Sequence, residues 1–591
     1  MLLFFVFLLC PYVLFAVVVP ATSQDVLDNV LCHCRGLTDK EIFHLEKLRY
    51  SIKRMDWYYA HYHANMVGDG GVVYFTDLLH DSVVDPDPSL SSNRFNSQEV
   101  GYLFNYFFDP RYLPKKNLKR VIVEKSCVHM PDVEMCLRFS AHNSCVDYVK
   151  KHRHDYGLVY KYLRVLASEH NIIQFVSLFS EFLHLDRDIF ASSKWNYLKR
   201  LYAREVIFHQ MSDYFQDAYD ILYSTYNEKR IRSINNQWLL GWLSLEFLSD
   251  HHKSLYHFHE FEQLVRTPVS VSRANYWLGH TYEKMGNIRE AISWYKRGAI
   301  YKHLFYGQMS LYKLHQMSNV DFSYNGNNIY NYSPFMKTEE FLSSIHIFNK
   351  QPSSHQSLLK ALYYFAYIKE NCLVKCIVNY IIRKDDINDF KIMLRIANMT
   401  SNNYLLVLVT KYLHNSQHVI LLDSLYPMDH HVNTFSSDLS NSWLLSIMRQ
   451  ESEFNHMAIS NSGAVGVMQL MPSVAKSLFR DIKLEYKQKL LHNPICNIQL
   501  GTMLMHKLYF GENKKSFVLS AGAYNAGTAN VSVWKNTMGD FQGTIDEKVK
   551  WIESIPFEET RDYVMYVIAN LNTYEMLLNE MNINTIYQSL Q

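Results

Sequence analysis

Two carboxylates, Glu451 and Glu453, stand inside the apolar stretch IMRQESEF. If this stretch is helical, Leu444, Ile447 and Met448 lie on the same face as Glu451, while Glu453 is expected to face water. A carboxylate among aliphatic side chains is disfavoured as an anion, so its pKa rises and it can hold a proton near neutral pH. A general acid needs this property to protonate a poor leaving group such as a glycosidic oxygen. Taken alone, the stretch is explained equally well by a buried glutamate with a structural arginine partner.

The elements that would position this acid are marked by residues that typically begin and end helices. Ser440 and Asn441 are candidate N-caps for the helix that carries it. Gly463 and Gly466 predict a backbone that turns or lies close to another segment, and Pro472 predicts the start of the next helix. On its own, each of these signals indicates only where a helix begins or ends.

Five blocks in a fixed order are more specific than any one of these signals. RQESEFN, AISNSGAVGVMQLMP, NPICNIQLG, AGAYNAG and PFEETRDYV resemble the catalytic domain of the soluble lytic murein transglycosylases, which have a goose-lysozyme-like fold. WLLGWLSLEFL, ANYWLGHTYEKMGN and FYGQMS extend the resemblance to the long, superhelical members of that family, over roughly residues 230–591. The chain departs from the family pattern at Val467, at Thr528 and at Glu453, and none of these departures removes a group that the chemistry requires.

The resemblance implies a substrate and a mechanism. The substrate would be the glycan strand of peptidoglycan, cut at the β-1,4 bond between N-acetylmuramic acid and N-acetylglucosamine. Glu451 would protonate the bridging oxygen, the sugar's acetamido group would stabilise the cation at C1, and Glu451 would then accept the proton of the 6-hydroxyl to give a 1,6-anhydro end. No cofactor is expected, and the spacings of the cysteines and histidines match no metal-ligand pattern, so no metal is expected either. Carried over position by position, the family's sugar-binding groups fall on Ser460, Gln469, Met471, Tyr524, Asn525 and Glu559.

Several alternatives stay open at this stage. A hydrolytic muramidase would use the same acid but release reducing ends, and a non-catalytic scaffold would bind glycan without cutting it. Glu559 could equally be a charge at a helix N-terminus, with Glu558 as an adjacent competitor.

Composition and periodicity predict an all-α chain. Only 20 Gly and 14 Pro occur in 591 residues, while Tyr and Phe number 43 and 34. Successive helices joined by short turns predict an α-solenoid of tetratricopeptide type at 151–318, best seen at 274–299, where Gly279, Ala291 and Gly298 would let two helices approach closely. Linker helices are expected at 319–436, and a lysozyme-like, mainly helical catalytic domain at 437–591. The boundary of the region 24–150 is unclear, although it contains helical spacing.

Charge and the N-terminus indicate where the chain acts. A net charge of +2, from 59 basic and 57 acidic residues, gives no bulk field for nucleic acid. The apolar run that ends at Pro20 predicts an export signal at 1–23 and therefore a periplasmic protein, with an uncleaved membrane anchor as the alternative. In an oxidising compartment two of Cys127, Cys136 and Cys145 could form a disulfide. The expected partners are glycan strands, and the solenoid's concave face could also hold other cell-wall enzymes.

Overall fold

The computed structural model describes residues 39–54, 60, 63–64, 66–67, 143–168, 171–185, 195–223, 234–318, 337–343, 356–382, 387–417, 419–434, 437–579 and 583–590. In these ranges the regular structure is helical, and the extended pairings are isolated bridges between residues 459 and 470. The prediction of an all-α chain is therefore confirmed. No helix in the same ranges has the length and apolar character needed to cross a membrane. The expected signal at 1–23 and Cys127 and Cys136 lie outside the described residues.

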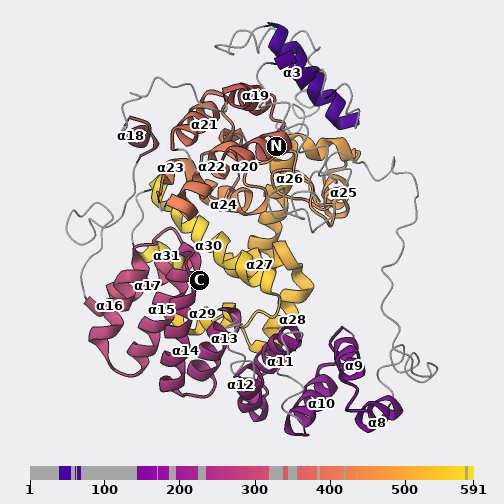
Figure 1. The fold of residues 1–591 in the computed structure, drawn as a ribbon, viewed down its shortest axis with the longest axis vertical. Coiled ribbons are helices and arrows are strands. Elements are labelled where there is room, and N and C mark those ends of the chain that lie inside the picture. The colour runs from indigo at the N-terminus through magenta and orange to yellow at the C-terminus, as the bar shows by residue number, and fades with distance from the viewer. Residues whose placement is uncertain are drawn as a thin grey trace, which may run out of the picture.

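The helices form three groups along the chain (Figure 1). After the N-terminal α3 (Asp39–Arg54), the first group is the predicted solenoid: α8 (Asn143–Lys151), α9 (Tyr156–Ser168), α10 (Ile172–Leu185), α11 (Asn196–Phe208), α12 (Phe215–Tyr223), α13 (Ile234–Glu246), α14 (His251–Leu264), α15 (Pro268–Lys284), α16 (Ile288–Ala299) and α17 (Phe305–Ser318). The second group is α18 (Thr338–Ser343), α19 (Gln356–Tyr367), α20 (Asn371–Ile381), α21 (Ile387–Met399), α22 (Asn403–Gln417) and α23 (Leu422–Leu425). The C-terminal group is α24 (Asn441–Glu451), α25 (Pro472–Asp481), α26 (Pro494–His506), α27 (Phe517–Ala526), α28 (Thr528–Met538), α29 (Ile545–Glu553), α30 (Glu558–Asn579) and α31 (Ile583–Ser589).

In the solenoid each helix packs against its neighbours in sequence, as in α13 with α14 and α15 with α16. The small residue at 279 has the predicted effect. A Cβ atom built on Gly279 would lie 2.7 Å from Cδ1 of Tyr295, so the ring of α16 rests directly on the backbone of α15. Gly241 allows the same close approach to Phe258 in the α13 and α14 pair, at 2.7 Å. Two helix pairs therefore use one packing device, as expected for degenerate repeats.

Gly279→Ala is expected to lower the free energy of unfolding by about 1–3 kcal/mol, because the added methyl group must displace the buried Tyr295 ring. Gly511→Ala is the matched control, since a Cβ atom there meets no atom within 4 Å. The two variants are compared with wild type by urea denaturation. Equal stability of both variants would mean that the α15 and α16 interface absorbs the methyl group without cost.

The buried apolar residues form two cores. One core joins the solenoid to the C-terminal group, and the other is built by the second group. Helix α3 belongs to the second core: Ile42, Leu45 and Leu48 are buried there, and α3 packs against α19. Lys360 of α19 pairs with Glu41 of α3 at 2.9 Å, and Arg49 of α3 pairs with Glu370, which immediately precedes α20. The helical part of the N-terminal region thus packs on the helices that follow the solenoid.

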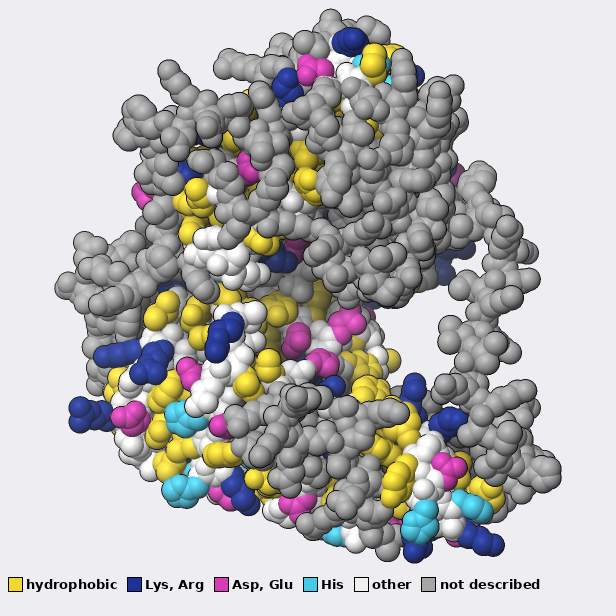
Figure 2. Space-filling view, viewed as in Figure 1, with side chains coloured by type: hydrophobic (Ala, Val, Ile, Leu, Met, Phe, Trp, Pro, Cys, Tyr) yellow, Lys and Arg dark blue, Asp and Glu magenta, His cyan; other side chains and the backbone are white. Residues whose placement is uncertain are grey.

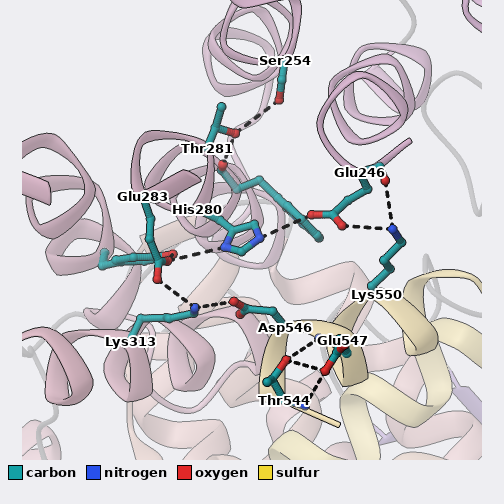
Figure 3. A network of polar contacts seen from close by, with 12 residues as sticks. Glu246, Ser254, His280, Thr281, Glu283, Lys313, Thr544, Asp546, Glu547 and Lys550 are labelled. Carbon is teal, nitrogen blue, oxygen red and sulfur yellow. Dashed lines mark hydrogen bonds and ion pairs between the residues drawn. The ribbon is translucent and has the colours of Figure 1, made fainter. Parts of the chain in front are cut away.

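The solenoid and the C-terminal group are joined by a polar network (Figure 3). His280 of α15 lies between Glu246 at 3.4 Å and Glu283 at 3.6 Å. Lys313 of α17 contacts Glu283 at 3.1 Å and Asp546 of α29 at 2.7 Å. Burial alone would lower the pKa of His280, but its hydrogen bonds to the two glutamates raise it above 6.5. Charges of both signs therefore alternate across this contact, which fixes how α29 sits on the solenoid.

Candidate active site

A cavity of about 750 Å³ opens beside Glu451, where three parts of the chain meet. Helices α20 and α22 form one wall, residues 450–461 and Gln469 form the second, and the first turns of α30 form the third. The space-filling view is hollowed near the middle of the molecule, and acidic side chains gather beside that hollow (Figure 2). The lining is polar, with amides, hydroxyls and charged groups among a few aromatic side chains. A cavity of this size and polarity suits a sugar chain.

Glu451 is the last residue of α24, the helix that Ser440 begins. The Ser440 Oγ atom accepts a hydrogen bond from the backbone nitrogen of Trp443 at 3.2 Å, which confirms one of the two predicted caps. Leu444 and Ile447 are buried on the same helix, as their spacing predicts. Burial raises the pKa of Glu451 to about 7, the negative charge of Glu559 adds to the rise, and a hydrogen bond from Tyr563 opposes it. Glu451 can therefore carry a proton near neutral pH.

The expectation that Glu453 faces water is wrong. Helix α24 ends at Glu451, and Glu453 and Phe454 adopt positive φ angles of 53° and 67°, so helical periodicity no longer decides where Glu453 points. Its carboxylate pairs with Lys411 of α22 and lies 3.7 Å from Arg449. Burial alone would raise the pKa of Glu453, but these two cations lower it. Glu453 is thus a charged, ion-paired carboxylate that lines the same cavity as Glu451.

The segment between α24 and α25 carries Ser460 and Gln469, and both line the cavity. Ser460 Oγ accepts a hydrogen bond from the nitrogen of Ala464 at 3.0 Å. The Gln469 amide nitrogen donates hydrogen bonds to the carbonyl oxygens of Ala458 at 3.1 Å and Gly466 at 2.9 Å. The amide therefore stabilises the segment between α24 and α25 and also lines the cavity.

Gly466 has a φ angle of +85°, and a Cβ atom there would lie 2.3 Å from the Asn497 Nδ2 atom. The predicted close backbone approach is confirmed. Asn497 of α26 is fully buried, and its amide holds this segment: it accepts from the nitrogen of Met468 at 2.8 Å and donates to Val465 at 2.9 Å and Leu491 at 3.0 Å.

Two of the remaining predicted residues do not line the cavity among the side chains described. Met471 is 38% exposed and precedes α25 as its N-cap residue. The Tyr524 hydroxyl donates to the carbonyl oxygen of Met468 at 2.7 Å, so it holds the segment between α24 and α25 rather than the acid. Asn525 does line the cavity, and its Oδ1 atom accepts a hydrogen bond from Thr560 at 2.6 Å.

The two adjacent glutamates at the start of α30, Glu558 and Glu559, line different cavities. Glu559 lines the cavity beside Glu451, whereas Glu558 lines a different cavity on the solenoid side. Both are exposed and both lie in the first turn of α30, where negative charge is favourable. Glu559 is therefore the glutamate that can meet a ligand of the Glu451 cavity.

Sequence reasoning missed Tyr563, whose hydroxyl donates to the Glu451 Oε1 atom at 2.6 Å. Its position four residues after Glu559 places both on one face of α30, which is a signal that the PFEETRDYV block contained. Sequence reasoning also missed the wall formed by α20 and α22, and no local pattern could have indicated it. Asn371 of α20 donates to the Asn455 Oδ1 atom at 3.0 Å and thereby ties this wall to the segment after the acid. Within the described residues, no group of three His, Cys, Asp or Glu side chains could hold a metal ion.

Comparison with known proteins shows what the part of the chain around Glu451 is similar to. Residues 433–546 match the family model described as the Transglycosylase SLT domain. The soluble lytic murein transglycosylase of Salmonella typhimurium is 39% identical over 140 residues, and that of Escherichia coli K12 is 38% identical over 140 residues. Each match covers 23% of this chain and only 21% of the relative.

The fold is similar over a longer range. An inactive Glu-to-Gln mutant of the lytic transglycosylase Slt from Pseudomonas aeruginosa superposes with a TM-score of 0.52 at 20% sequence identity, covering 93% of this chain and 74% of that one. At this identity the likeness concerns the fold alone. The family-model match, by contrast, covers residues 433–546 and therefore includes Glu451. Residues 433–546 of this chain therefore match the transglycosylase SLT domain, and the relatives that are similar in sequence are soluble lytic murein transglycosylases.

Proposed function

We propose that this protein is a lytic transglycosylase that cleaves the glycan strand of peptidoglycan between N-acetylmuramic acid and N-acetylglucosamine. The observation that carries the proposal is the carboxyl group of Glu451. It stands at a polar cavity of about 750 Å³, its pKa is raised to about 7, and it lies within an SLT domain. Because peptidoglycan is the substrate, the protein is proposed to act in the periplasm. The signal at 1–23 and protein partners on the solenoid remain predictions.

In the proposed reaction Glu451 acts twice. The protonated carboxyl group donates its proton to the bridging oxygen as the bond to C1 breaks. The substrate's acetamido carbonyl stabilises the cation at C1 from within the same sugar. The Glu451 carboxylate then accepts the proton of the 6-hydroxyl, whose oxygen bonds to C1. The glutamate regains its proton, no water is consumed, and the product ends in a 1,6-anhydro ring.

The surrounding groups have roles that follow from their contacts. Tyr563 donates to the Glu451 carboxylate and so holds it in place, which makes Tyr563 a positioning residue. Gln469, Asn525 and Ser460 present amide and hydroxyl groups that can hydrogen-bond sugar hydroxyls and acetamido groups. Glu453 is held as an anion by Lys411 and Arg449, which makes it unsuited to donate a proton.

The chemistry is tested by digesting purified sacculi with the full chain and analysing the fragments by mass spectrometry. The expected muramic acid ends carry the anhydro ring and weigh roughly 18 mass units less than hydrolytic ends. Reducing ends would make the protein a hydrolytic muramidase. Glycan binding without any fragments would identify a scaffold.

Tyr563→Phe is expected to move the alkaline limb of the pH–rate profile to higher pH by up to about one unit. The Tyr563 hydrogen bond lowers the pKa of Glu451, so its loss lets the carboxyl group keep its proton at higher pH. Tyr524→Phe is the matched control, because its hydroxyl bonds a backbone carbonyl and not the acid. An unmoved limb in Tyr563→Phe would show that this tyrosine does not set the pKa of the acid.

A further inference from the structure

A second cavity, of about 780 Å³, lies where the solenoid meets the C-terminal domain. Helices α9, α11, α13 and α15 line it from the solenoid side, and residues 556–558 and Arg561 line it from the other side. It is separate from the Glu451 cavity, since the two share no lining residue. Nothing in the proposed reaction uses it.

Positive charge dominates the walls of this second cavity. Lys161, Arg164 and Arg200 line it, and no ion pair with a carboxylate is described for any of them in the part of the chain that the structure covers. Glu205 and Glu558 are the acidic side chains of the lining. Burial raises the pKa of Glu205 to about 7, so this carboxyl group offsets only part of the positive charge near neutral pH.

Three more arginines lie deeper in the same cavity and converge on Glu553, two of them on its carboxylate and one on its backbone carbonyl. Arg273 contacts the Glu553 Oε1 atom at 2.5 Å, and the Arg561 Nε atom lies 3.5 Å from Oε2. Arg204 donates to the Glu553 carbonyl oxygen at 2.6 Å. The Arg273 Nε atom is buried without a hydrogen-bond partner in the described structure. Asp562 and Glu558 also lie close enough to interact with these arginines. The six Lys and Arg side chains of the lining still outnumber the four carboxyl groups of Glu205, Glu553, Glu558 and Asp562, so this cavity attracts anions.

We propose that this cavity binds a peptide that carries several carboxylates, and that the ligand is the stem peptide of the cell wall. The choice of a wall peptide rests on the proposed function. Guanidinium groups on two sides match carboxylates spaced along a chain, because each can form a bidentate pair. Tyr197 and Phe557 also line the cavity and are 57% and 43% exposed, which offers apolar contact for the backbone and aliphatic parts of a peptide.

Helix α30 connects this cavity to the catalytic one. Glu558 and Arg561 face the peptide cavity, while Glu559, Asp562 and Tyr563 of the same two turns face the Glu451 cavity. A peptide held by Arg561 would therefore stabilise the turns of α30 that present Tyr563 to the acid. The arrangement would let the enzyme recognise glycan that still carries its peptides.

The test measures binding by isothermal titration calorimetry with the full chain. The probe is the synthetic peptide L-alanyl-γ-D-glutamyl-diaminopimelate, compared with the same peptide with its carboxylates amidated and with inorganic phosphate. The variant is the double change Arg164→Gln and Arg200→Gln, which removes two of the cations that have no described ion pair. The matched control is Arg289→Gln with Lys296→Gln, two exposed cations of α16 outside the cavity.

The expected result is saturable binding of the free acid, a Kd about tenfold higher in the cavity variant, and an unchanged Kd in the control. The Glu451→Gln protein should bind the peptide as wild type does. Binding by the Glu451→Gln protein separates this inference from the proposed reaction. Peptide binding to the second cavity requires no bond cleavage, and formation of the anhydro product requires no peptide in the second cavity. Absence of binding, equal binding of the amidated peptide, competition by phosphate at equal concentration, or loss of binding in Glu451→Gln would each overturn the proposal.

Discussion

Glu451→Gln is expected to reduce the rate of glycan cleavage by about 10²–10⁴-fold while the fold stays intact. Glutamine has nearly the same shape as glutamate and can still accept the hydrogen bond from Tyr563, but it has no proton to donate to the bridging oxygen. The same change removes the base for the 6-hydroxyl, so both halves of the proposed reaction fail together. The rate is measured as release of soluble fragments from purified sacculi.

Stability as a function of pH supplies an independent check of the same variant. The folded-state pKa of Glu451 is about 7, above its ordinary value of 4.5. A group whose pKa is raised by folding contributes stability at low pH and loses that contribution as pH rises through its folded pKa. Glutamine does not ionise, so the variant should unfold at the same temperature as wild type or higher at pH 8. Glu512→Gln, at an exposed carboxylate, is the control and should change neither activity nor stability. Cleavage at the wild-type rate by Glu451→Gln would exclude this residue as the acid.

The part of the site that lies within short stretches of sequence could be predicted. The cap at Ser440, the buried face of α24 and the close approach at Gly466 each depend on residues that are near one another or on backbone geometry that only glycine permits. The tight pairing of α15 with α16 follows in the same way from Gly279 and Tyr295. In these places local chemistry and tertiary structure require the same residue.

What could not be predicted depends on where helices end and on which distant segments meet. Helical periodicity predicted that Glu453 would face solvent, because nothing in the sequence indicated that α24 ends two residues earlier. Its partner Lys411 is 42 residues away on a different group of helices. Tyr563 reaches Glu451 across 112 residues. Burial of a carboxyl group can be predicted from one helix, but the group that bonds to it cannot.

Arginine clusters are a second feature that the sequence does not reveal. Arg204, Arg273 and Arg561 are unremarkable in sequence, and they converge only because α11, α15 and α30 meet at Glu553. One fully buried carboxylate is therefore among the groups that join the solenoid to the C-terminal group. Its removal should have a large effect, since a buried charge is tolerated only when it is paired.

Glu553→Gln is accordingly expected to destabilise the contact between the solenoid and the C-terminal domain by about 3–5 kcal/mol. Burial alone would lower the pKa of Arg273, but the negative charge of Glu553 raises it. Glu553 also accepts a hydrogen bond from the hydroxyl group of Tyr306. Glutamine can retain a hydrogen bond, but it removes the carboxylate that Arg273 and Arg561 contact directly. Asp562 and Glu558 then remain as the nearby anions for the three guanidinium groups. Because the protein contains more than one structural unit, the effect is measured as a fall in the first midpoint of urea unfolding rather than as one global free energy.

The same exposed substitution, Glu512→Gln, serves as the control for the loss of one negative charge. A further arm uses the wall peptide proposed for the neighbouring cavity. If its carboxylates bind near Arg273 and Arg561, the peptide should restore part of the lost midpoint in Glu553→Gln, because a ligand that binds only the folded state stabilises it. An identical midpoint for Glu553→Gln and Glu512→Gln would mean that the arginines find other counter-charges or water. In that case Glu553 would not be the residue that holds the two parts together.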